Sequence, residues 1–351
     1  MAQKNDTILQ GVEWYLPEDG SFWRRLKDLA SSFSLLGFTS IWLPPAYKGQ
    51  AGIHDVGYGV YDLYDLGEFD QKGTICTKYG TKLEYIDAVK TLKAQNLYVL
   101  ADIVLKQRMG ADELEHVYAI EENPTNRNQA VSGEEDVELW TKFTFPGRNG
   151  KYSDFIWNHA CFDGTDWDED DYKSAVYRIR GHHWDTQVDN ELGNYDYLMG
   201  CDTDVDNPKV REELMKWGRW YFDMVHPDGV RMDALKHIDC SFIAWWLEQL
   251  REYRQDNFFA VGEYWNSSVD KLLRYLDINR NAMSLFDVPL HYRLFHASNS
   301  QGNFDMGLSS KIHLSKRVEV RQLLLLIIMI RNLDRHSILL CNHGLSNWYM
   351  H

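Results

Sequence analysis

Arg231 and Asp233 have the residue types and the spacing that a carboxylate nucleophile needs. They lie in the segment Asp228–His237, whose apolar residues predict a short buried strand, Gly229–Met232, that ends at Asp233. The positive charge of a neighbouring arginine keeps an aspartate ionised near neutral pH, and an ionised carboxylate can attack an electrophilic carbon. A surface turn that holds a salt bridge is the alternative interpretation of these residues.

A second acid, Glu263, follows the apolar segment Phe258–Gly262 and precedes two aromatic residues. Asp233 and Glu263 end successive predicted strands, so they can face each other across a cleft. Two such carboxylates suit the hydrolysis of glycosidic bonds, and a separation of about 5 Å would give retention of configuration. Apolar and aromatic neighbours raise the pKa of a carboxyl group, as an acid catalyst requires. The alternatives are a metal site and two solvated acids.

The elements that must position these acids alternate along the chain. Apolar periodicity predicts helices at 21–36, 81–94, 208–225, 241–254 and 269–276, and strands at 7–14, 38–43, 97–102, 229–233, 258–263 and 284–288. This alternation predicts an α/β fold with a parallel sheet and helices outside it. Three strands end in an acid, namely Asp102, Asp233 and Glu263, and in a β/α barrel such strand ends converge on the active face.

The alternation is interrupted after the third strand by about a hundred residues rich in Gly, Asp, Asn and aromatic side chains. A structureless loop of that length is not expected inside a compact domain, so we predict an inserted subdomain. The predicted organisation is a barrel domain formed by 1–105 and 207–310, a subdomain at 106–206, and a tail of different composition at 311–351.

The composition is that of a large soluble domain with an acidic surface. The chain has 351 residues, 44% of them hydrophobic and 25% charged, and a formal net charge of -15. Without a run of Lys and Arg, this charge makes nucleic acid and anionic membranes poor partners, and the apolar run Leu323–Ile330 is too short to span a bilayer. No apolar segment follows the N-terminal residues, and the five cysteines form no CxxC pair. These features predict a cytoplasmic protein with reduced thiols.

A resemblance to a known family extends over most of residues 6–310. The segments that carry it are Glu13–Pro17, Trp42–Gly49, Asp55–Asp65, Ala101–Leu105, Gly229–His237 and Val261–Trp265. The chain resembles the α-amylase family of glycoside hydrolases, in particular the bacterial intracellular liquefying type. The resemblance implies a (β/α)8 TIM-type barrel with an inserted subdomain after strand 3, here C-terminally incomplete. It also implies retaining endo-hydrolysis of α-1,4-glucosidic bonds in starch, glycogen or maltooligosaccharides.

The resemblance assigns a catalytic role to each residue of the strand-end group. It implies that Asp233 is the nucleophile and that Glu263 is the general acid and base. Arg231 would hold the nucleophile in its ionised form. Asp102 would hold the cleft together at the end of the third strand. For each residue, ordinary packing inside a barrel is the alternative.

The resemblance also implies a set of residues that bind the α-glucan partner. Lys236 and His237 would contact sugar hydroxyls on the leaving-group side of the cleavage point. Tyr58 would be the stacking platform at the cleavage point, and Trp14 would lie nearby. The 14% aromatic content of the chain suits stacking on sugar faces, although most of the rings are expected in the core.

The inserted segment is rich in carboxylates, and clusters of hard oxygen ligands suit calcium. From the residues alone, a solvated acidic surface is the favoured interpretation. In the amylases that the chain resembles, the counterparts of four aspartates hold a calcium–sodium–calcium cluster, namely Asp163, Asp185, Asp196 and Asp202. The carbonyl of His237 would join this cluster. The resemblance therefore implies calcium, together with sodium, as a cofactor that ties the insert to the barrel.

One departure from the family pattern follows the third strand, where Lys106 and Gln107 replace an Asn-His pair. The replaced asparagine is a calcium ligand, and the replaced histidine contacts the sugar at the cleavage point. An ammonium group has no lone pair to offer and repels a cation. The sequence therefore predicts weakened calcium binding. Gln107 can still donate a hydrogen bond but cannot carry the charge of an imidazole.

A second departure lies in the tail. The family's seventh strand ends in an Asn-His-Asp motif, which does not occur after Glu263. Back-translation of Gln322–Asn332 can encode this motif in another reading frame. We therefore predict a frameshift around residues 307–321, in the gene or in its sequencing. Such a chain would have about six of eight barrel strands and exposed strand edges, so we expect poor folding and little or no amylase activity.

Two other functions remain compatible with the sequence. A non-catalytic glucan-binding protein would keep the aromatic cleft and bind maltooligosaccharides without turnover. A transglycosylase, or an enzyme of the sucrose or trehalose type, would use the same barrel with another acceptor. The segment Glu13–Pro17 and the Gly-Tyr-Gly-Val-Tyr-Asp-Leu block resemble liquefying amylases more than these relatives.

Overall fold

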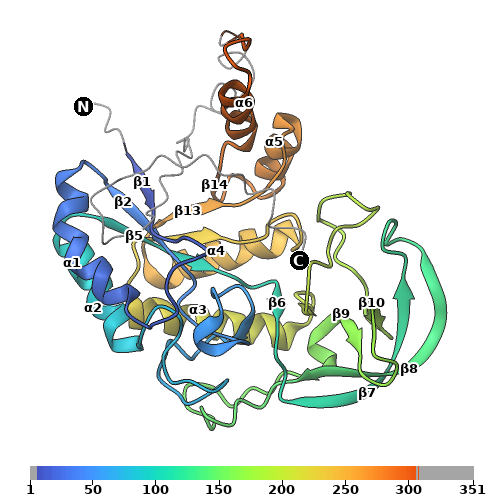
Figure 1. The fold of residues 1–351 in the computed structure, drawn as a ribbon. Helices are drawn as coiled ribbons and strands as arrows, with labels where there is room; N and C mark the ends of the chain where they lie inside the picture. Colours follow the sequence, from blue (N-terminus) through green and yellow to red (C-terminus); the bar gives the residue numbers. More distant parts are fainter. Residues whose placement is uncertain (1–5, 306, 308–351) are drawn as a thin grey trace.

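A parallel sheet forms the centre of the fold, with the strand order β1-β2-β5-β12-β13-β14. The structure, a computed structural model, describes residues 6–305 and Gly307. The strands of this sheet are β1 (Ile8–Gln10), β2 (Ser40–Leu43), β5 (Tyr98–Ile103), β12 (Gly229–Met232), β13 (Phe259–Gly262) and β14 (Ser284–Leu285). Figure 1 shows that the sheet curves, with helices along its outer side.

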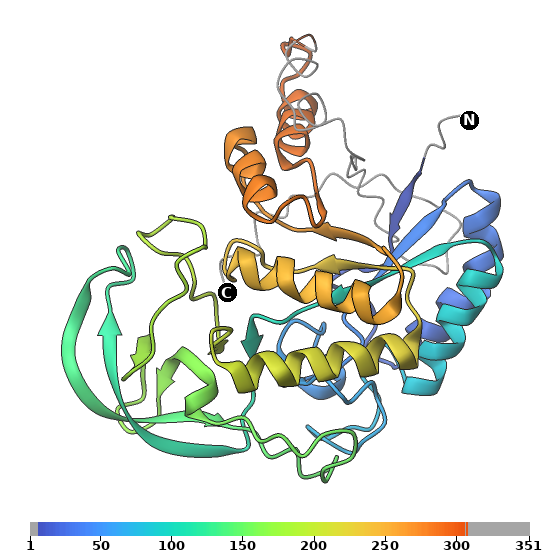
Figure 2. The same cartoon turned by 180° about the vertical axis from the view of Figure 1, so that it is seen from behind.

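The helices alternate with these strands, and α1 to α5 pack beside one another in chain order. They are α1 (Phe22–Leu35), α2 (Lys82–Ala94), α3 (Pro208–Val225), α4 (Cys240–Arg254), α5 (Val269–Ile278) and α6 (Val288–Asn299). The start of α2 is fixed by a capping box, in which Thr81 and Glu84 satisfy each other's backbone N–H groups. Side chains of α1 at helical spacing, among them Trp23, Leu26 and Ala30, are buried. The view from behind shows α3 and α4 running along the sheet (Figure 2).

Strand β12 lies in the middle of the sheet, between β5 and β13, and all four of its residues are buried. Val230 and Met232 suit a strand that is covered on both faces, as in α/β proteins, whereas Arg231 is a buried charge within this strand. A Cβ atom on Gly229 would lie 2.4 Å from the carbonyl oxygen of Phe259 and 2.8 Å from a methyl group of Leu100. Glycine at this position therefore permits close packing of β12 against β5 and β13 where β12 begins.

The insert forms a second, antiparallel sheet with the order β6-β11-β9-β10-β7-β8. Its strands are β6 (Gln107–Arg108), β7 (Glu113–Glu122), β8 (Ala130–Lys142), β9 (Phe162–Asp168), β10 (Lys173–Ile179) and β11 (Cys201–Thr203). The sequence analysis did not predict the long β7–β8 hairpin. The first seven residues of β8 are almost all exposed, so they lack the apolar alternation that marks a half-buried strand.

Two predicted strands differ from those observed. The strand predicted at 7–14 is limited to Ile8–Gln10. The strand predicted at 284–288 is only two residues long, and helix α6 follows it. Asp287 caps this helix through a bond from the Leu290 N–H at 3.1 Å, and Pro289 lies in its first turn. A proline cannot donate to a strand ladder but is compatible with a helix N-terminus, and this explains the difference.

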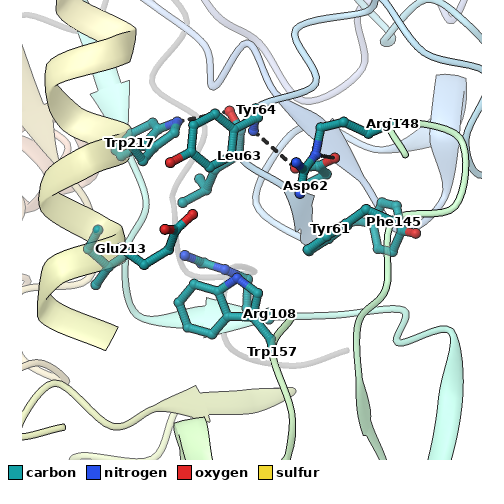
Figure 3. A pocket seen from close by; sticks show the side chains of 11 residues that line it. Tyr61, Asp62, Leu63, Tyr64, Arg108, Phe145, Arg148, Trp157, Glu213 and Trp217 are labelled. Carbon is teal, nitrogen blue, oxygen red and sulfur yellow. Dashed lines mark hydrogen bonds and ion pairs between the residues drawn. The ribbon is translucent and has the colours of Figure 1, made fainter. Parts of the chain in front are cut away.

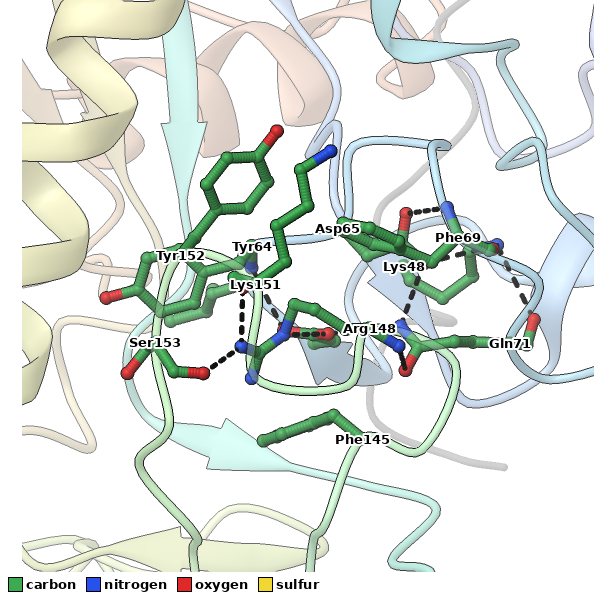
Figure 4. A network of polar contacts seen from close by, with 12 residues as sticks. Lys48, Tyr64, Asp65, Phe69, Gln71, Phe145, Arg148, Lys151, Tyr152 and Ser153 are labelled. Atoms are coloured by element: carbon green, nitrogen blue, oxygen red, sulfur yellow. Dashed lines mark hydrogen bonds and ion pairs between the residues drawn. The ribbon is translucent and has the colours of Figure 1, made fainter.

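A buried polar network joins the segment around strands β3 (Lys48–Gly49) and β4 (Val60–Asp62) to the insert. The Lys48 ammonium lies 3.5 Å from the Asp65 carboxylate, and neither side chain is exposed. Gln71 Nε2 donates to both Asp62 and Asp65 at 3.0 Å, and Arg148 Nε donates to Asp62 at 2.8 Å. Figure 4 shows the Lys48, Asp65, Gln71 and Arg148 part of this network. These contacts fix the loop beside the third barrel strand to the inserted residues.

In the part of the chain that the structure describes, no helix is both long and apolar enough to cross a membrane. The four cysteines in this part, Cys76, Cys161, Cys201 and Cys240, are unpaired. The predicted tail at 311–351 lies outside the described residues. The predicted frameshift at 307–321 also lies outside them, apart from Gly307.

Candidate active site

Three acids meet at the carboxyl ends of neighbouring strands. Asp102 lies near the end of β5, while Asp233 and Glu263 directly follow β12 and β13. The strand register places Arg231 opposite Asp102 on one side and opposite Val261 on the other. The N–H of Glu263 donates to the Met232 carbonyl at 3.0 Å, which continues the ladder to the site. The strand ends therefore lie level with one another, as the sequence analysis expected.

The guanidinium of Arg231 binds all three acids. Its Nη1 donates to Asp233 Oδ1 at 2.5 Å and to Asp102 Oδ1 at 2.9 Å. Its Nη2 donates to the Glu263 carboxylate. The Arg231 side chain is only 2% exposed, whereas Asp233 and Glu263 are 10% and 18% exposed. The two acids that were predicted to react therefore lie side by side on one guanidinium and keep access to the surface.

Burial and charge act in opposite directions on the acids of this group. Burial raises the pKa of Glu263 to about 7, against the lowering effect of Arg231 and with the help of the negative charge on Asp233. Burial likewise raises the pKa of Asp102 to about 6, again against Arg231. For Arg231, burial lowers the pKa, but the charges of Asp102, Glu263 and Asp233 outweigh it. Glu263 is thus suited to hold a proton near neutral pH.

Asp102 is fully buried and is held by aromatic donors as well as by Arg231. The Tyr58 hydroxyl donates to Asp102 Oδ2 at 2.8 Å, and Trp42 Nε1 donates to the same oxygen at 2.9 Å. The guanidinium of Arg231 lies 4.7 Å from the ring centre of Trp42. Trp42 lies in one of the segments that carry the family resemblance, but no role was predicted for it. Its contact comes from the adjacency of β2 and β5, which the residue pattern alone did not specify.

An aromatic pair lines the same end of the barrel. The rings of Trp14 and Tyr58 are nearly parallel, at 4°, with centroids 6.2 Å apart. Tyr58 is buried, whereas Trp14 is 43% exposed. Tyr58, the predicted stacking platform, and Trp14, which was predicted to lie nearby, are therefore side by side, and Tyr58 is anchored to Asp102 through its hydroxyl.

The two residues that follow the nucleophile strand contact the insert. Lys236 Nζ donates to Glu191 at 2.5 Å and lies 4.9 Å from the ring centre of Tyr195. The His237 ring is 1% exposed, with Nδ1 2.8 Å from the Tyr195 carbonyl oxygen. Burial lowers the pKa of His237 to about 3, so the imidazole is neutral. Glu191 and Tyr195 were not predicted, because they are distant in sequence and carry no local motif.

The four aspartates assigned to a metal cluster are all buried: Asp163, Asp185, Asp196 and Asp202. Carboxylate oxygens of Asp163, Asp196 and Asp202 lie within 4.8 Å of one another. Asp185 joins them through its N–H, which donates to Asp196 Oδ2 at 2.8 Å. Burial raises the pKa of Asp163 to about 7, and burial with the nearby charge of Asp196 raises that of Asp185 to about 9.

Lys106, which lies between β5 and β6, enters this cluster. Its Nζ donates to Asp196 Oδ1 at 2.6 Å and pairs with the Asp202 carboxylate. Burial alone would lower the pKa of Lys106, but the charges of Asp196, Asp202 and Asp185 outweigh it and raise the pKa. On the other side, the His182 ring lies 3.7 Å from Asp163 and 3.1 Å from Asp204. The sequence analysis did not identify His182 or Asp204 as part of this group.

A small cavity lies between α3 and the insert, away from the strand-end acids (Figure 3). Arg108 and Glu213 point into it, and the guanidinium of Arg108 lies 4.7 Å from the ring centre of Trp157. Arg108 Nη1 donates to the Gln107 carbonyl at 2.8 Å, while Nη2 has no hydrogen-bond partner among the described residues. None of the three strand-end acids lines this cavity.

Comparison with known proteins decides the family. The family model described as the alpha amylase catalytic domain matches residues 32–345. The chain belongs to the α-amylase family. It is 50% identical over 307 residues to an α-amylase of Geobacillus stearothermophilus, and 43% identical over 307 residues to the cytoplasmic α-amylase of Escherichia coli. These alignments cover 87% and 86% of this chain, but only 56% and 62% of the two α-amylases.

The fold agrees with this assignment. An α-amylase structure from Geobacillus thermoleovorans, in complex with acarbose, matches with a TM-score of 0.51 at 19% identity. The match covers 83% of this chain and 51% of that chain. The predicted fold class, a TIM-type barrel with an insert after the third strand, is confirmed. The described residues contribute six parallel strands to it.

The metal cluster that the resemblance to α-amylases implies fits these residues only in part. The buried carboxylates are brought together, and Asp163 Oδ2 has no hydrogen-bond partner among the described residues, which suits a further cation. Against this, a calcium ion binds oxygen at about 2.3–2.6 Å, and the Lys106 ammonium already lies 2.6 Å from Asp196 Oδ1. An ammonium and a calcium ion cannot both take this position, so the inner part of the cluster does not fit the metal.

Proposed function

We propose that this chain carries an α-amylase site that cleaves internal α-1,4-glucosidic bonds of starch, glycogen and maltooligosaccharides with retention of configuration. The observation that carries the proposal is the binding of Asp102, Asp233 and Glu263 to the single buried guanidinium of Arg231. The similarity of the chain to the α-amylases of Geobacillus stearothermophilus and Escherichia coli supports the proposal. Because the chain spans about six-tenths of the length of those relatives, the activity remains a proposal for this chain.

In the proposed reaction, Asp233 attacks the anomeric carbon, and an ester bond forms as the glucosidic C–O bond breaks. Glu263 gives its proton to the departing oxygen. Glu263, now ionised, takes a proton from water, and the resulting hydroxide attacks the anomeric carbon. The ester bond then breaks and Asp233 is restored. The pKa of Glu263, raised to about 7 by burial, favours the protonated acid that the first step needs.

Arg231 and Asp102 position the reacting acids. Arg231 Nη1 lies 2.5 Å from Asp233 Oδ1, so a permanent positive charge adjoins the proposed nucleophile. Asp102 holds Nη1 from the other side at 2.9 Å. Tyr58 and Trp42 hold Asp102 in place through their own bonds to Oδ2. The guanidinium cannot rotate without losing its bonds to Asp102 and Asp233. The arrangement would keep the nucleophile in one orientation during the reaction.

The glucan would lie over the aromatic pair and beside Lys236. Trp14 and Tyr58 present nearly parallel rings, and Trp14 is partly exposed, as a stacking surface requires. Lys236 would donate to sugar hydroxyls, and in the described structure its ammonium donates to Glu191. The imidazole of His237 is buried, and its Nε2 has no hydrogen-bond partner among the described residues. The proposed sugar contact of His237 would therefore require this atom to be uncovered.

The proposal includes the division into a barrel at 1–105 and 207–310 and an insert at 106–206, and a cytoplasmic location, as the name of the Escherichia coli relative suggests. The resemblance implies a calcium site at Asp163, Asp185, Asp196 and Asp202 with the carbonyl of His237, but the proposed activity does not include a bound calcium ion. Because Lys106 occupies the inner part of this cluster, no step of the proposed reaction passes through a metal.

A second candidate function is binding of α-glucan without turnover. It is favoured by one observation: the Asn-His-Asp motif expected after Glu263 does not occur in the sequence. For the same reason we expect the hydrolytic activity of this chain to be low. A starch assay of reducing ends, with Asp233→Asn as the inactive control, separates the two functions. Calorimetric binding of maltohexaose without any release of reducing ends above that control would favour the second.

A further inference from the structure

Lys106 is a lysine with almost no access to solvent, at 1% exposure, and it lies where the barrel and the insert meet. It follows β5, and its carbonyl accepts a bond from the Thr203 N–H of β11 at 2.9 Å. Its ammonium donates to Asp196 Oδ1 at 2.6 Å and pairs with Asp202. A buried ammonium is stable only when such charged partners surround it.

The acids around Lys106 connect it to the segment that follows the proposed nucleophile. Asp196 Oδ2 accepts from the Asp185 N–H at 2.8 Å. The Asp185 carboxylate in turn accepts from the Asp239 N–H at 3.1 Å. Asp239 is the N-cap of α4, the helix after strand β12. A single ammonium therefore holds the end of β5, strand β11 and the start of α4 in one connected group.

The positive charge at this junction can be supplied by a side chain of the protein or by a bound metal ion. Calcium needs six to eight oxygen ligands at about 2.3–2.6 Å, and a lysine side chain offers no oxygen. The Lys106 ammonium lies 2.6 Å from Asp196 Oδ1, a distance at which a calcium ion would bind this oxygen, and it also pairs with Asp202. Asp163, the third acid of the cluster, faces the imidazole of His182 at 3.7 Å.

We propose that Lys106 is the resident cation of this junction, so that the insert is joined to the barrel without a divalent metal. Lys106 thereby replaces the calcium that the family resemblance implies, and the junction forms during folding of the chain alone. The proposal concerns the cation requirement of folding, and it goes beyond the proposed activity. Its test needs no substrate, so a failure of one proposal does not affect the other.

The first test uses the full chain and two measurements. Calcium binding is measured by calorimetry on protein treated with EDTA, and the unfolding temperature is measured in EDTA and in millimolar calcium. We expect no stoichiometric calcium binding at micromolar concentrations and the same unfolding temperature in both solutions. Stoichiometric binding with an unfolding temperature that rises with calcium concentration would overturn the proposal, because a ligand that binds only the folded state stabilises it in this way.

The second test converts the junction to a metal-dependent one. In Lys106→Asn, the ammonium is replaced by an amide oxygen that can bind calcium. We expect this variant to unfold at a lower temperature in EDTA and to recover by several degrees when calcium is added. The control is Lys90→Asn, which changes an exposed lysine of α2 and should respond to neither solution. A Lys106→Asn variant that is as stable as the parent in EDTA would overturn the proposal.

If Lys106→Asn does not fold in either solution, the measurements on the unaltered chain decide the question by themselves. Asp163 Oδ2, which has no hydrogen-bond partner among the described residues, is the place where a remaining ion would bind. Asp163→Asn distinguishes this case: calcium binding that is present in the unaltered chain and lost in Asp163→Asn would locate a metal in the cluster, and the proposal would be wrong.

Discussion

Arg231 Nη1 donates to Asp233 Oδ1 at 2.5 Å, from a guanidinium that is almost entirely buried. The same side chain binds Asp102 and Glu263, so one residue carries the positive charge for three carboxylates. This relationship connects the stability of the barrel centre to the proposed chemistry. It also makes Arg231 the residue whose replacement is most informative.

Replacing Arg231 with methionine should lower both stability and activity. The substitution leaves three acids without their shared partner, and breaking a buried ion pair in this way costs about 3–5 kcal/mol of unfolding free energy. Loss of the fixed charge beside the nucleophile should reduce kcat by about a hundredfold or more. Urea unfolding and a starch assay measure the two effects. The control is Arg274→Met, at an exposed position of α5; equal stability of the two variants would contradict the assigned role.

Replacing Glu263 with glutamine should separate the two proposed chemical steps. The amide cannot protonate a poor leaving oxygen or activate water, but Asp233 remains able to attack. With a maltosyl donor that has a good leaving group, the first step should still occur, and a covalent glycosyl-enzyme should accumulate. Mass spectrometry of the intact chain should show this added mass, and the mass should be missing in the double variant with Asp233→Asn. Equal labelling of both variants would exclude Asp233 as the nucleophile.

Activity should fall as the pH rises above neutrality, because Glu263 must hold a proton in the first step. Its pKa is raised from 4.5 to about 7, chiefly by burial.

The raised pKa of Glu263 also affects the stability of the folded chain. Between these two values the folded chain holds a proton that the unfolded chain releases, so the contribution of Glu263 to stability decreases as pH rises. Unfolding measured from pH 4 to pH 8 should show a weaker decrease in Glu263→Gln; an identical pH profile would contradict the shift.

The residue after the nucleophile adopts a left-handed conformation. Ala234 has a φ of 53°, which costs an alanine about 1–2 kcal/mol relative to the right-handed region. Glycine avoids this cost but loses more conformational entropy on folding. Ala234→Gly should therefore be stabilised slightly, by about 0.5–1 kcal/mol. Chemical unfolding measures the change, and destabilisation would show that the alanine methyl group makes a packing contact of greater value.

The sequence was sufficient to predict the strand-end acids, for a physical reason. Asp102, Asp233 and Glu263 each follow an apolar run, and parallel strands place such ends at one edge of a sheet. The partners of these acids could not be predicted in the same way. Trp42 reaches Asp102 from the neighbouring strand, and Glu191 reaches Lys236 from the insert; both contacts depend on how distant segments pack.

The contacts within the acidic cluster also could not be predicted from the sequence. The sequence predicts that the Lys106 ammonium weakens calcium binding by repulsion. In the structure, the lysine also holds Asp196 and Asp202 together through its contacts with both acids. The spacing of the sequence did not predict these contacts, because both acids are distant from Lys106 along the chain. The inserted β7–β8 hairpin was missed because its solvent-exposed residues carry no periodic apolar signal.

The most direct test of the proposed function is proton NMR of maltohexaose incubated with the full chain and, in parallel, with the Asp233→Asn variant. We predict cleavage that depends on Asp233, slower than that of the full-length Geobacillus stearothermophilus relative, with the new reducing end released as the α-anomer. Release of the β-anomer, or cleavage no faster than that of the Asp233→Asn variant, would contradict a retaining α-amylase site built on Asp233, Glu263 and Arg231.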